Sequence, residues 1–262
     1  MILTVKPKKF ELYHNTDKKT AAQVRASTGA DIVINCWLYD MKTFEACCDV
    51  KVKGVVLHDD QYKYWGYGFN KNDTRMTMSD QMNKWENYFS CVGMLKDGKK
   101  IDMYYDKNVG RNTSRSAVGF KADGTMVIYC TKSSISIPSV QKTMLNEGCV
   151  DAVNMDGGAS VQIASDYGSI TSYRRVHGYL CIWIEKDKTC PYKEPTINIR
   201  LNSRGEGAKW TQWHLNQHGA KLTVDGIFGV KSVTELKAFQ KKANLVADGI
   251  CGKATRTALK NI

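Results

Sequence analysis

The sequence predicts an α+β chain: a domain of mixed or antiparallel sheets with flanking helices, followed by a small all-α domain of three helices. Short apolar runs such as 54–57, 117–120 and 179–184 lie between turn residues, which is typical of strands. An internal repeat over 222–252 carries a glycine before each expected helix. A hydrophobic fraction of 42% in 262 residues is enough to build two separate cores.

Composition divides the chain into two domains. The stretch 187–204 contains Pro191 and Pro195, many charges and little apolar periodicity, as expected of a linker. We therefore expect one domain at 1–186 and a second at 205–262. Within the first, we expect helices at about 18–27 and 139–146 and mostly strands and hairpins elsewhere.

The repeat in the second domain has an offset of 23 residues, with Leu222–Gly229 recurring as Leu245–Gly252. Each copy is an Asp-Gly turn, an apolar residue and a glycine before a helix; Leu236 and Phe239 share one face of the first such helix. Because one copy buries little surface alone, the two copies must pack against each other.

Two histidine groups invite a metal interpretation. His214 and His218 are spaced i, i+4 on the expected helix at Trp210 and Trp213, but the sequence offers no third ligand. Packing or solvated histidines are the favoured interpretation there. The group His58-Asp59-Asp60 follows the strand 54–57 and predicts a turn, with a metal or acid–base cluster as the alternative.

Cysteine usage and the amino terminus predict where the protein is made. The nine cysteines are odd in number and form no Cys-x-x-Cys pair, which argues against a zinc site or a disulfide framework. Most are expected as core residues of a protein made in a reducing cytoplasm, with Cys47, Cys48 and Cys190 the more exposed ones. Met1–Glu11 lacks a following apolar segment, so no secretory signal is expected. No apolar run approaches membrane-spanning length, so no membrane insertion is expected.

The net charge of +12 is spread along the chain rather than gathered in one basic helix or aromatic motif. This distribution disfavours nucleic acid as a partner. It favours a solvated basic surface that suits anionic polymers.

The segment Cys149–Ser160 carries the strongest functional signal. It reads as an apolar strand that ends in Asp156, two glycines and a hydroxyl. Strand alternation predicts that Asn154 and Asp156 point to one side. Gly157 and Gly158 can bring backbone N–H groups close to an anion. An ordinary Asp-Gly turn after a strand is the alternative.

Two arginines stand beside strands and suit an anionic ligand. Arg115 lies at the start of the strand 117–120, and Arg174 lies shortly before the strand 179–184. A guanidinium group matches two phosphate oxygens, so both predict phosphate contacts. Solvated surface arginines are the alternative, and either Arg174 or Arg175 could turn inward.

These segments resemble the phosphodiester glycosidase family. The family string Asn-Leu-Asp-Gly-Gly-Gly-Ser appears here as 154–160, with Met155 and Ala159 as departures. The segment 31–40 resembles the early strand that normally ends Asn-Gly-Gly-Phe-Phe, although only Asn35 and the aromatic character remain. The segments 114–128 and 174–184 resemble the family's Arg-Thr-Ala-Ile-Gly hairpin and closing Arg-x-Val strand. The resemblance covers about residues 10–186.

The resemblance implies a hydrolase that cleaves a sugar from a phosphodiester, which needs a carboxylate near the anomeric carbon. Asp156 is the expected nucleophile or general base, and Arg115 and Arg174 are expected to stabilise the departing phosphate. The expected substrate-binding residues are Asn35, Asn154, Gly157, Gly158 and Ser160. A second carboxylate is not identified, with Asp40, Asp59 and Asp60 as possibilities. No cofactor is expected, and a divalent metal is left open.

The second domain resembles the peptidoglycan-binding domain, whose pattern Val-Asp-Gly-Ile-Phe-Gly matches residues 224–229 and whose Phe-Gln follows as Phe239-Gln240. Together the domains predict a wall-targeted hydrolase with peptidoglycan and an anionic wall glycopolymer as partners. The N-acetylglucosamine-1-phosphate linkage of teichoic acid is the candidate bond, and a phage lytic or tail protein the candidate source. The alternatives are a non-catalytic glycan-binding or wall-adhesion protein and a wall amidase or muramidase.

Overall fold

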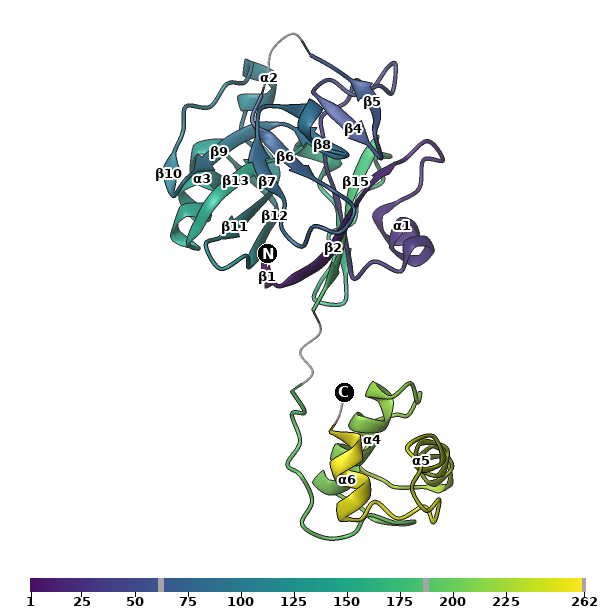
Figure 1. Cartoon of the computed structure of the whole chain (residues 1–262). Coiled ribbons are helices and arrows are strands. Elements are labelled where there is room, and N and C mark those ends of the chain that lie inside the picture. The colour runs from purple at the N-terminus through teal and green to yellow at the C-terminus, as the bar shows by residue number, and fades with distance from the viewer. Residues whose placement is uncertain (61–63, 186–188, 261–262) are drawn as a thin grey trace. The chain divides into compact units, whose positions relative to one another are not determined.

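The computed structural model describes residues 1–60, 64–185 and 189–260. The chain separates into two compact units, Met1–Glu185 and Lys186–Ile262, which are described one at a time (Figure 1). The first combines sheets and helices and the second is helical. The α+β fold class expected from the sequence is therefore confirmed.

Three antiparallel sheets build the described part of the first unit. In spatial order, sheet I consists of β1 (Ile2–Val5), β12 (Met126–Ile135), β11 (Thr113–Lys121), β13 (Cys149–Asn154), β9 (Val92–Lys96) and β10 (Lys99–Lys100). Sheet II consists of β14 (Ile163–Ser165), β3 (Ile32–Asn35), β15 (Gly178–Ile184) and β2 (Pro7–His14). Sheet III consists of β5 (Val55–His58), β4 (Val50–Val52), β8 (Asn87–Ser90), β6 (Gly66–Phe69) and β7 (Thr77–Ser79).

Short helices complete the unit. They are α1 (Ala21–Thr28), α2 (Lys107–Gly110), α3 (Ile137–Asn146) and the 3₁₀ turns η1 (Met82–Lys84) and η2 (Gly158–Ser160). Helix α3 packs on β13 and its neighbours in sheet I, and α1 packs on β3, β14 and β15 of sheet II. Sheets I and II therefore each have an α-helix packed against them.

Sheet II separates two apolar clusters because its side chains alternate between the two faces. Ile32 and Ile34 of β3 belong to the main core shared with sheets I and III. Val33, which lies between them, belongs to a smaller core beneath α1. The apolar run of β3 is buried on both faces, which explains why it lacks the polar alternation of a half-exposed strand.

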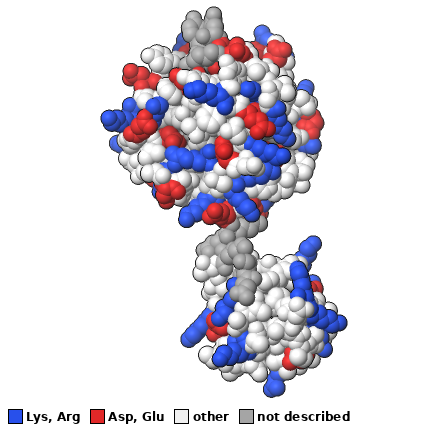
Figure 2. All heavy atoms as spheres, in the orientation of Figure 1, with Lys and Arg blue, Asp and Glu red and all other residues white. Residues whose placement is uncertain are grey.

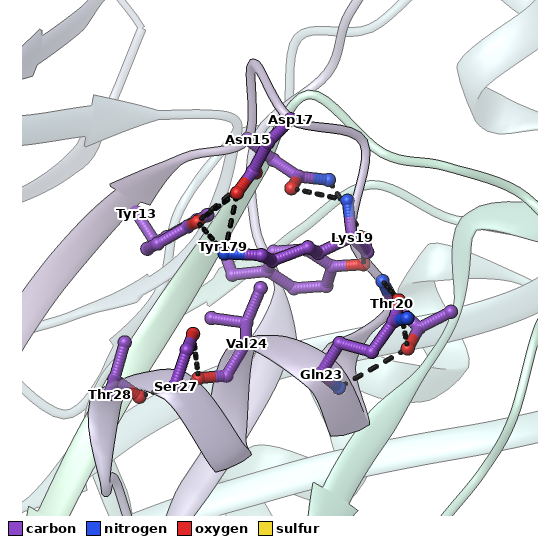
Figure 3. A network of polar contacts seen from close by, with 10 residues as sticks. All are labelled: Tyr13, Asn15, Asp17, Lys19, Thr20, Gln23, Val24, Ser27, Thr28 and Tyr179. Atoms are coloured by element: carbon purple, nitrogen blue, oxygen red, sulfur yellow. Dashed lines mark hydrogen bonds and ion pairs between the residues drawn. The ribbon is translucent and has the colours of Figure 1, made fainter.

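Helix α1 begins later than expected because its start is fixed by side chains. Thr20 and Gln23 form a reciprocal capping box, and Lys18 before them has φ +52° and is not helical. The loop before the cap is held by Asn15, which exchanges two hydrogen bonds with the backbone of Lys19. Figure 3 shows this network, with Tyr179 of β15 reaching in from the sheet. Its hydroxyl donates to the Lys19 carbonyl at 3.0 Å.

The other predicted elements of this unit lie within a few residues of their expected places. Helix α3 begins at Ile137, two residues earlier than expected, because Ser136 caps it and Pro138 occupies its first turn. Strand β11 begins at Thr113, so Arg115 lies inside the strand rather than at its start. Strands β5 and β15 match the runs at 54–57 and 179–184, and His58 is the last residue of β5.

The described residues 189–260 of the second unit contain α4 (Glu206–Gln217), α5 (Val230–Lys242) and α6 (Lys253–Leu259). The sequence repeat appears as a repeated hydrogen-bond pattern. Gln212 of α4 donates to Asp225 and accepts from the N–H of Gly226, and Gln240 of α5 does the same with Asp248 and Gly249. Helices α4 and α5 thus each carry a glutamine that fixes the Asp-Gly turn following the helix.

Residues expected as a linker contribute to this second unit. Ile199 is buried in its core and pairs with Cys251 in an isolated β-bridge. Cys190 and Tyr192 pack against the same core, and Glu194 pairs with Lys260. The proline and charge content of this stretch therefore reflects an extended segment wrapped on the helices, while 186–188 lie outside the described residues.

Surface and thiol features differ in part from expectation. Of the cysteines expected to be exposed, Cys47 is exposed and Cys190 half-buried, but Cys48 is buried in the main core. Basic and acidic side chains are interspersed over the face drawn in Figure 2. No helix in the described parts of the chain is both long and apolar enough to span a membrane.

Candidate functional site

A cavity of about 340 Å³ lies in the first unit, just beyond the ends of β3 and β13 and at the start of β11. Its lining combines one carboxylate with three guanidinium groups and a glycine-rich backbone. The lining residues are Leu38, Tyr39, Met41, Asn108, Val109, Arg111, Thr113, Arg115, Met155, Asp156, Gly157, Gly158, Ala159, Ser160 and Arg174. Of the sequence-predicted site residues, it gathers Asp156, Arg115, Arg174, Gly157, Gly158 and Ser160.

Backbone hydrogen bonds to two sheets fix Asp156. Its N–H donates to the carbonyl of Cys36, just after β3, at 2.9 Å. Its carbonyl accepts from Asn35 Nδ2 of β3 at 2.7 Å and from Ser116 Oγ of β11 at 2.9 Å. Asp156, the second residue beyond β13, is thus held between sheets I and II, so its carboxylate has a defined direction.

Burial raises the pKa of the Asp156 carboxyl from 3.8 to about 6. Hydrogen bonds from the Ser160 hydroxyl and the Gly157 N–H, with the positive charges of Arg174 and Arg115, oppose this rise. A carboxyl with a pKa near neutrality exchanges protons readily at physiological pH. Such a perturbed group in a cavity is typical of catalytic sites.

The two glycines are required by their surroundings. A Cβ at Gly157 would lie 2.9 Å from the Ser114 carbonyl oxygen and 3.3 Å from Arg115 Nη1. Gly158 has φ +63°, a left-handed conformation that favours glycine. Ala159, which replaces the third glycine of the family string, is not among the residues with positive φ. This departure therefore introduces no backbone strain.

Arg115 lies mainly in the wall of the cavity rather than in its open part. Its side chain is 2% exposed, and Nη2 donates to the carbonyls of Val109 (2.9 Å) and Arg111, while Nε donates to that of Ile135 at 3.4 Å. The sequence predicted a direct phosphate contact, but these bonds make it a clamp on the segment 109–111. Its charge still reaches the cavity, because it lowers the pKa of Asp156.

The choice between Arg174 and Arg175 follows from their positions. Arg174 is half-buried and lines the cavity, whereas Arg175 is exposed and donates to the carbonyl of Tyr173 at 3.3 Å. The carbonyl of Arg174 accepts from Gln162 Nε2 at 3.0 Å. The backbone of Arg174 is therefore anchored, and its guanidinium is the one available to the cavity.

The two predicted asparagines lie behind the cavity instead of lining it. The side-chain amide of Asn35 donates to the carbonyl of Asp156 and to Ser116 Oγ. Its oxygen accepts from the N–H of Gln162. Asn154 is fully buried, and its Nδ2 donates to the carbonyl of Met155 at 2.8 Å. The expected alternation fails because β13 ends at Asn154, before Asp156. These residues position the strand end.

Sequence reasoning missed residues that support the site from remote segments. Tyr39 lines the cavity; desolvation raises its pKa, and its hydroxyl donates to the Arg175 carbonyl at 2.9 Å. Gln162 joins Asn35, Arg174 and the hydroxyl of Tyr179 through its backbone and amide groups. No local pattern marks Gln162, because its partners come from β3, β15 and the loop before β15.

The other carboxylates considered as catalytic partners lie elsewhere. Asp40 is exposed and accepts from the N–H groups of Lys42 and Thr43, and Asp59 and Asp60 do not line the cavity. His214 and His218 bond to the carbonyls of Trp210 and Leu259. In the part of the chain that the structure describes, no group of three or more His, Cys, Asp or Glu residues could hold a metal ion.

Residues 28–183 match the phosphodiester glycosidase family. The chain belongs to this family. Residues 204–259 match the peptidoglycan binding domain, which follows the glycosidase domain. A search of the curated proteins gives no match. The resemblances inferred from the residues are therefore confirmed for both domains.

The first two of the following solved structures share the fold of this chain. The zebrafish N-acetylglucosamine-1-phosphodiester alpha-N-acetylglucosaminidase catalytic domain is 14% identical, with 68% of this chain and 73% of that chain covered and a TM-score of 0.54. A hypothetical protein from Synechocystis is 9% identical, with coverages of 70% and 59% and a TM-score of 0.58. An endolysin of Burkholderia phage AP3 is 37% identical over 25% of each chain, with a TM-score of 0.24.

Proposed function

We propose that the protein hydrolyses the bond between the anomeric carbon of a sugar and a phosphodiester in the bacterial wall. The observation that carries the proposal is a cavity in which Asp156 faces three guanidinium groups. The positive excess favours an anionic substrate. The N-acetylglucosamine-1-phosphate diester that joins teichoic acid to the wall is the candidate bond.

In this mechanism, Asp156 acts on the anomeric carbon as its ionised carboxylate. An oxocarbenium-like transition state is stabilised by a nearby negative charge, either through covalent attack or through activation of a water. Ser160 and the N–H of Gly157 keep the carboxylate oriented. Because the backbone of Asp156 is already fixed, little conformational entropy is lost when its carboxylate is brought to the reacting carbon.

Arg174 and Arg111 receive the departing phosphate. Both line the cavity, and Arg115 adds a fixed positive charge behind them. A phosphate ester is a much weaker base than a sugar alkoxide, so it can leave without a dedicated proton donor. Within the described lining, Asp156 is the one carboxylate, which agrees with a reaction that needs no second acid.

The peptidoglycan binding domain supplies the wall targeting. A tethered binding module raises the effective concentration of wall substrate around the catalytic domain. The presence of this domain supports action at the bacterial wall. That the protein is made without a secretory signal, and that it comes from a phage, stay predictions.

The test is release of reducing sugar from a synthetic N-acetylglucosamine-1-phosphodiester. We expect Asp156→Asn to lower kcat by more than tenfold, a transition-state effect above about 1.4 kcal/mol. Asp97→Asn is the matched control, because Asp97 lies in the β9–β10 turn with φ +50°, which asparagine tolerates.

Three outcomes would contradict the proposal. Wild-type activity in Asp156→Asn would remove the carboxylate from the reaction. Binding of the substrate without turnover would favour the glycan-binding alternative. Cleavage of peptidoglycan with no release of sugar from the phosphodiester would favour an amidase or muramidase.

A further inference from the structure

Two hydrogen bonds between ring nitrogens link Trp37, His177 and His14 in the first unit. Trp37 Nε1 donates to His177 Nδ1 at 2.7 Å, and His177 Nε2 lies 3.0 Å from His14 Nε2 of β2. Trp37 is 1% exposed and His177 is 5% exposed. A Cβ at Gly178 would lie 1.9 Å from Trp37 Cζ2, so the indole packs directly on that glycine. Trp37 stands where the family string has its second glycine, so the linkage is not part of that string.

The tautomers of both imidazoles follow from the indole, because an indole nitrogen donates and does not accept. Since Trp37 donates to His177 Nδ1, the proton of neutral His177 is on Nε2. His177 Nε2 therefore donates to His14 Nε2. A metal ion at His177 Nε2 would need the lone pair there, which would put the proton on Nδ1, opposite the indole N–H. The arrangement is thus a neutral hydrogen-bonded chain.

An additional proton on the histidine pair breaks one of these two bonds. On His177 it goes to Nδ1, opposite the Trp37 N–H, and on His14 it goes to Nε2, opposite the His177 N–H. Burial lowers the pKa of His14. Burial and the charge of His14 lower the pKa of His177 to about 4. The linkage is therefore intact at neutral pH and opens in acid.

The charged side chains on the segments around the pair have other partners. Asp17, in the loop after β2, pairs with Lys19 at 2.6 Å. The Lys18 ammonium lies 5.2 Å from the centroid of the Phe44 ring, which meets the His177 ring edge-on. Arg175 donates to a backbone carbonyl of its own segment. A proton taken up by the pair therefore gains no counter-ion from these residues.

One end of the linkage lies beside Asp156, which has further supports. Trp37 follows Cys36, whose carbonyl accepts from the Asp156 N–H at 2.9 Å. Asn35 and Ser116 hold the carbonyl of Asp156 without any bond to the linkage. Loss of the Trp37 bond therefore leaves the carboxylate of Asp156 in place.

The other end of the linkage sets the position of Arg174, which lines the cavity. His177 ends the segment 174–177, directly before β15. In this segment the carbonyl of Arg175 accepts from the Tyr39 hydroxyl at 2.9 Å. The Tyr39 ring lies nearly parallel to the His177 ring, at 22° with the ring centroids 6.4 Å apart. A displacement of His177 therefore disturbs both the end of the segment and the tyrosine that anchors its middle.

We infer that His177 is a positioning residue: in its neutral form it holds Arg174 opposite Asp156, and protonation of the His14–His177 pair releases Arg174 from that place. The inference rests on the proposed function, since Arg174 is the group that meets the departing phosphate. Acid then weakens the phosphate contact reversibly, in a step separate from the protonation of Asp156.

The first test needs no substrate. In the full-length protein with ¹⁵N-labelled tryptophan, Trp37→Phe identifies the indole signal of Trp37. We expect this signal to shift reversibly between pH 7.5 and pH 4, while those of Trp65, Trp85 and Trp183 stay in place. In His177→Asn the signal should stay constant, because the amide oxygen replaces Nδ1 as acceptor and is not protonated in this range. A constant signal in the wild type, or one that moves only together with the other three, overturns the inference.

The second test measures kcat on the soluble phosphodiester at pH 7.5. We expect His177→Phe, which keeps a ring but loses the acceptor, to lower kcat at least fivefold, and His177→Asn to stay within twofold of wild type. Because His177 acts through Arg174, His177→Phe combined with Arg174→Ala should be within twofold of Arg174→Ala alone. His58→Phe is the matched control, because His58 lies on β5 of sheet III and does not line the cavity.

Wild-type kcat in His177→Phe, or losses that multiply in the double variant, would overturn the positioning role. If the wild type cleaves no phosphodiester, the proposed function fails and phosphate binding decides the inference. Inorganic phosphate should then bind the wild type at least threefold more tightly than His177→Phe or Arg174→Ala. Equal affinity of all three proteins overturns the link between His177 and Arg174.

Discussion

At the scale of single residues, the site depends on how Asp156 is held. The carboxyl stands at a strand end in a partly dehydrated cavity, with hydrogen bonds from Ser160 and Gly157 and with arginines at its sides. Desolvation outweighs these stabilising contacts, so its pKa rises to about 6. A carboxylate that is costly to bury is a strong base or nucleophile once ionised.

The first prediction concerns the pH dependence of activity. Because the mechanism needs ionised Asp156, kcat/KM should fall as the pH drops through about 6. A pH series with the soluble phosphodiester, from pH 4.5 to 8.5, measures the profile. A profile that rises below pH 6 would make Asp156 the proton donor instead.

The same pKa makes a prediction about stability. The folded-state pKa of Asp156 lies above its unfolded value, so the residue costs stability as the pH rises from 3.8 through about 6. This displacement corresponds to at most roughly 3 kcal/mol. Asp156→Asn should therefore be more stable than the wild type at pH 7.5, with a smaller difference at pH 5. Urea unfolding at both pH values measures this, and a less stable variant at pH 7.5 would contradict it.

At Arg115, we predict that a positive charge alone does not maintain stability and activity. Arg115→Lys keeps the positive charge but cannot reach the carbonyls of Val109, Arg111 and Ile135 together. We expect a loss of roughly 2–4 kcal/mol in unfolding free energy and activity close to that of Arg115→Ala. Arg111→Lys, at an exposed position, should leave stability within about 0.5 kcal/mol of wild type. Full activity of Arg115→Lys would show that the clamp is unnecessary.

At the scale of elements, β13 links the site to the core. It lies between β11 and β9 in sheet I, and α3 covers it. Behind the site, its Asp151 accepts from the Tyr67 hydroxyl of β6 at 2.5 Å and pairs with Arg75 at 2.7 Å. This buried contact ties sheet III to sheet I.

Tyr67→Phe tests that tie. Removing the hydroxyl takes one hydrogen bond from the buried Asp151 and leaves its ion pair with Arg75, so the unfolding free energy should fall by roughly 1–3 kcal/mol. The kcat on the soluble phosphodiester should stay within about twofold, since Tyr67 does not line the cavity. Tyr13→Phe is a matched control at an exposed hydroxyl that contacts Asp17. Equal stability of Tyr67→Phe and wild type would show that the tie contributes little.

The sequence predicted the elements better than it predicted the roles of side chains. The strand before Asp156 and the glycine pair follow from local pattern and backbone chemistry, and the structure has them at the cavity. Arg115 and Asn35 look like ligand groups in the sequence, but Arg115 bonds to nearby backbone carbonyls. The partners of Asn35 are a hydroxyl and a carbonyl from distant segments. Such partners depend on how the sheets meet, which no local pattern encodes.

At the scale of the whole molecule, we expect the two units to fold and function separately when the chain is cut between them. A cut after Glu185 should leave a fragment 1–185 that cleaves the soluble substrate like the full chain, because every residue of the cavity lies within it. The fragment 186–262 should sediment with purified peptidoglycan, and 1–185 should not. On insoluble wall, 1–185 should be the slower enzyme at low concentration. Equal rates on wall would contradict a targeting role.

The position of the cut is itself a prediction. A cut after Pro195 removes Tyr192 and the Glu194 pair from the second unit, so the fragment that begins at 196 should unfold at lower temperature than 186–262. Thermal unfolding of the two fragments measures the difference. Identical melting temperatures would show that residues 189–195 act only as a linker.

The central claim is that the bond to the anomeric carbon is the one that breaks. Hydrolysis of the N-acetylglucosamine-1-phosphodiester in ¹⁸O-labelled water, followed promptly by mass spectrometry, tests it most directly. Attack at the anomeric carbon near Asp156 predicts the label in the released sugar and an unlabelled phosphate monoester. Label in the phosphate would show attack at phosphorus and contradict the account.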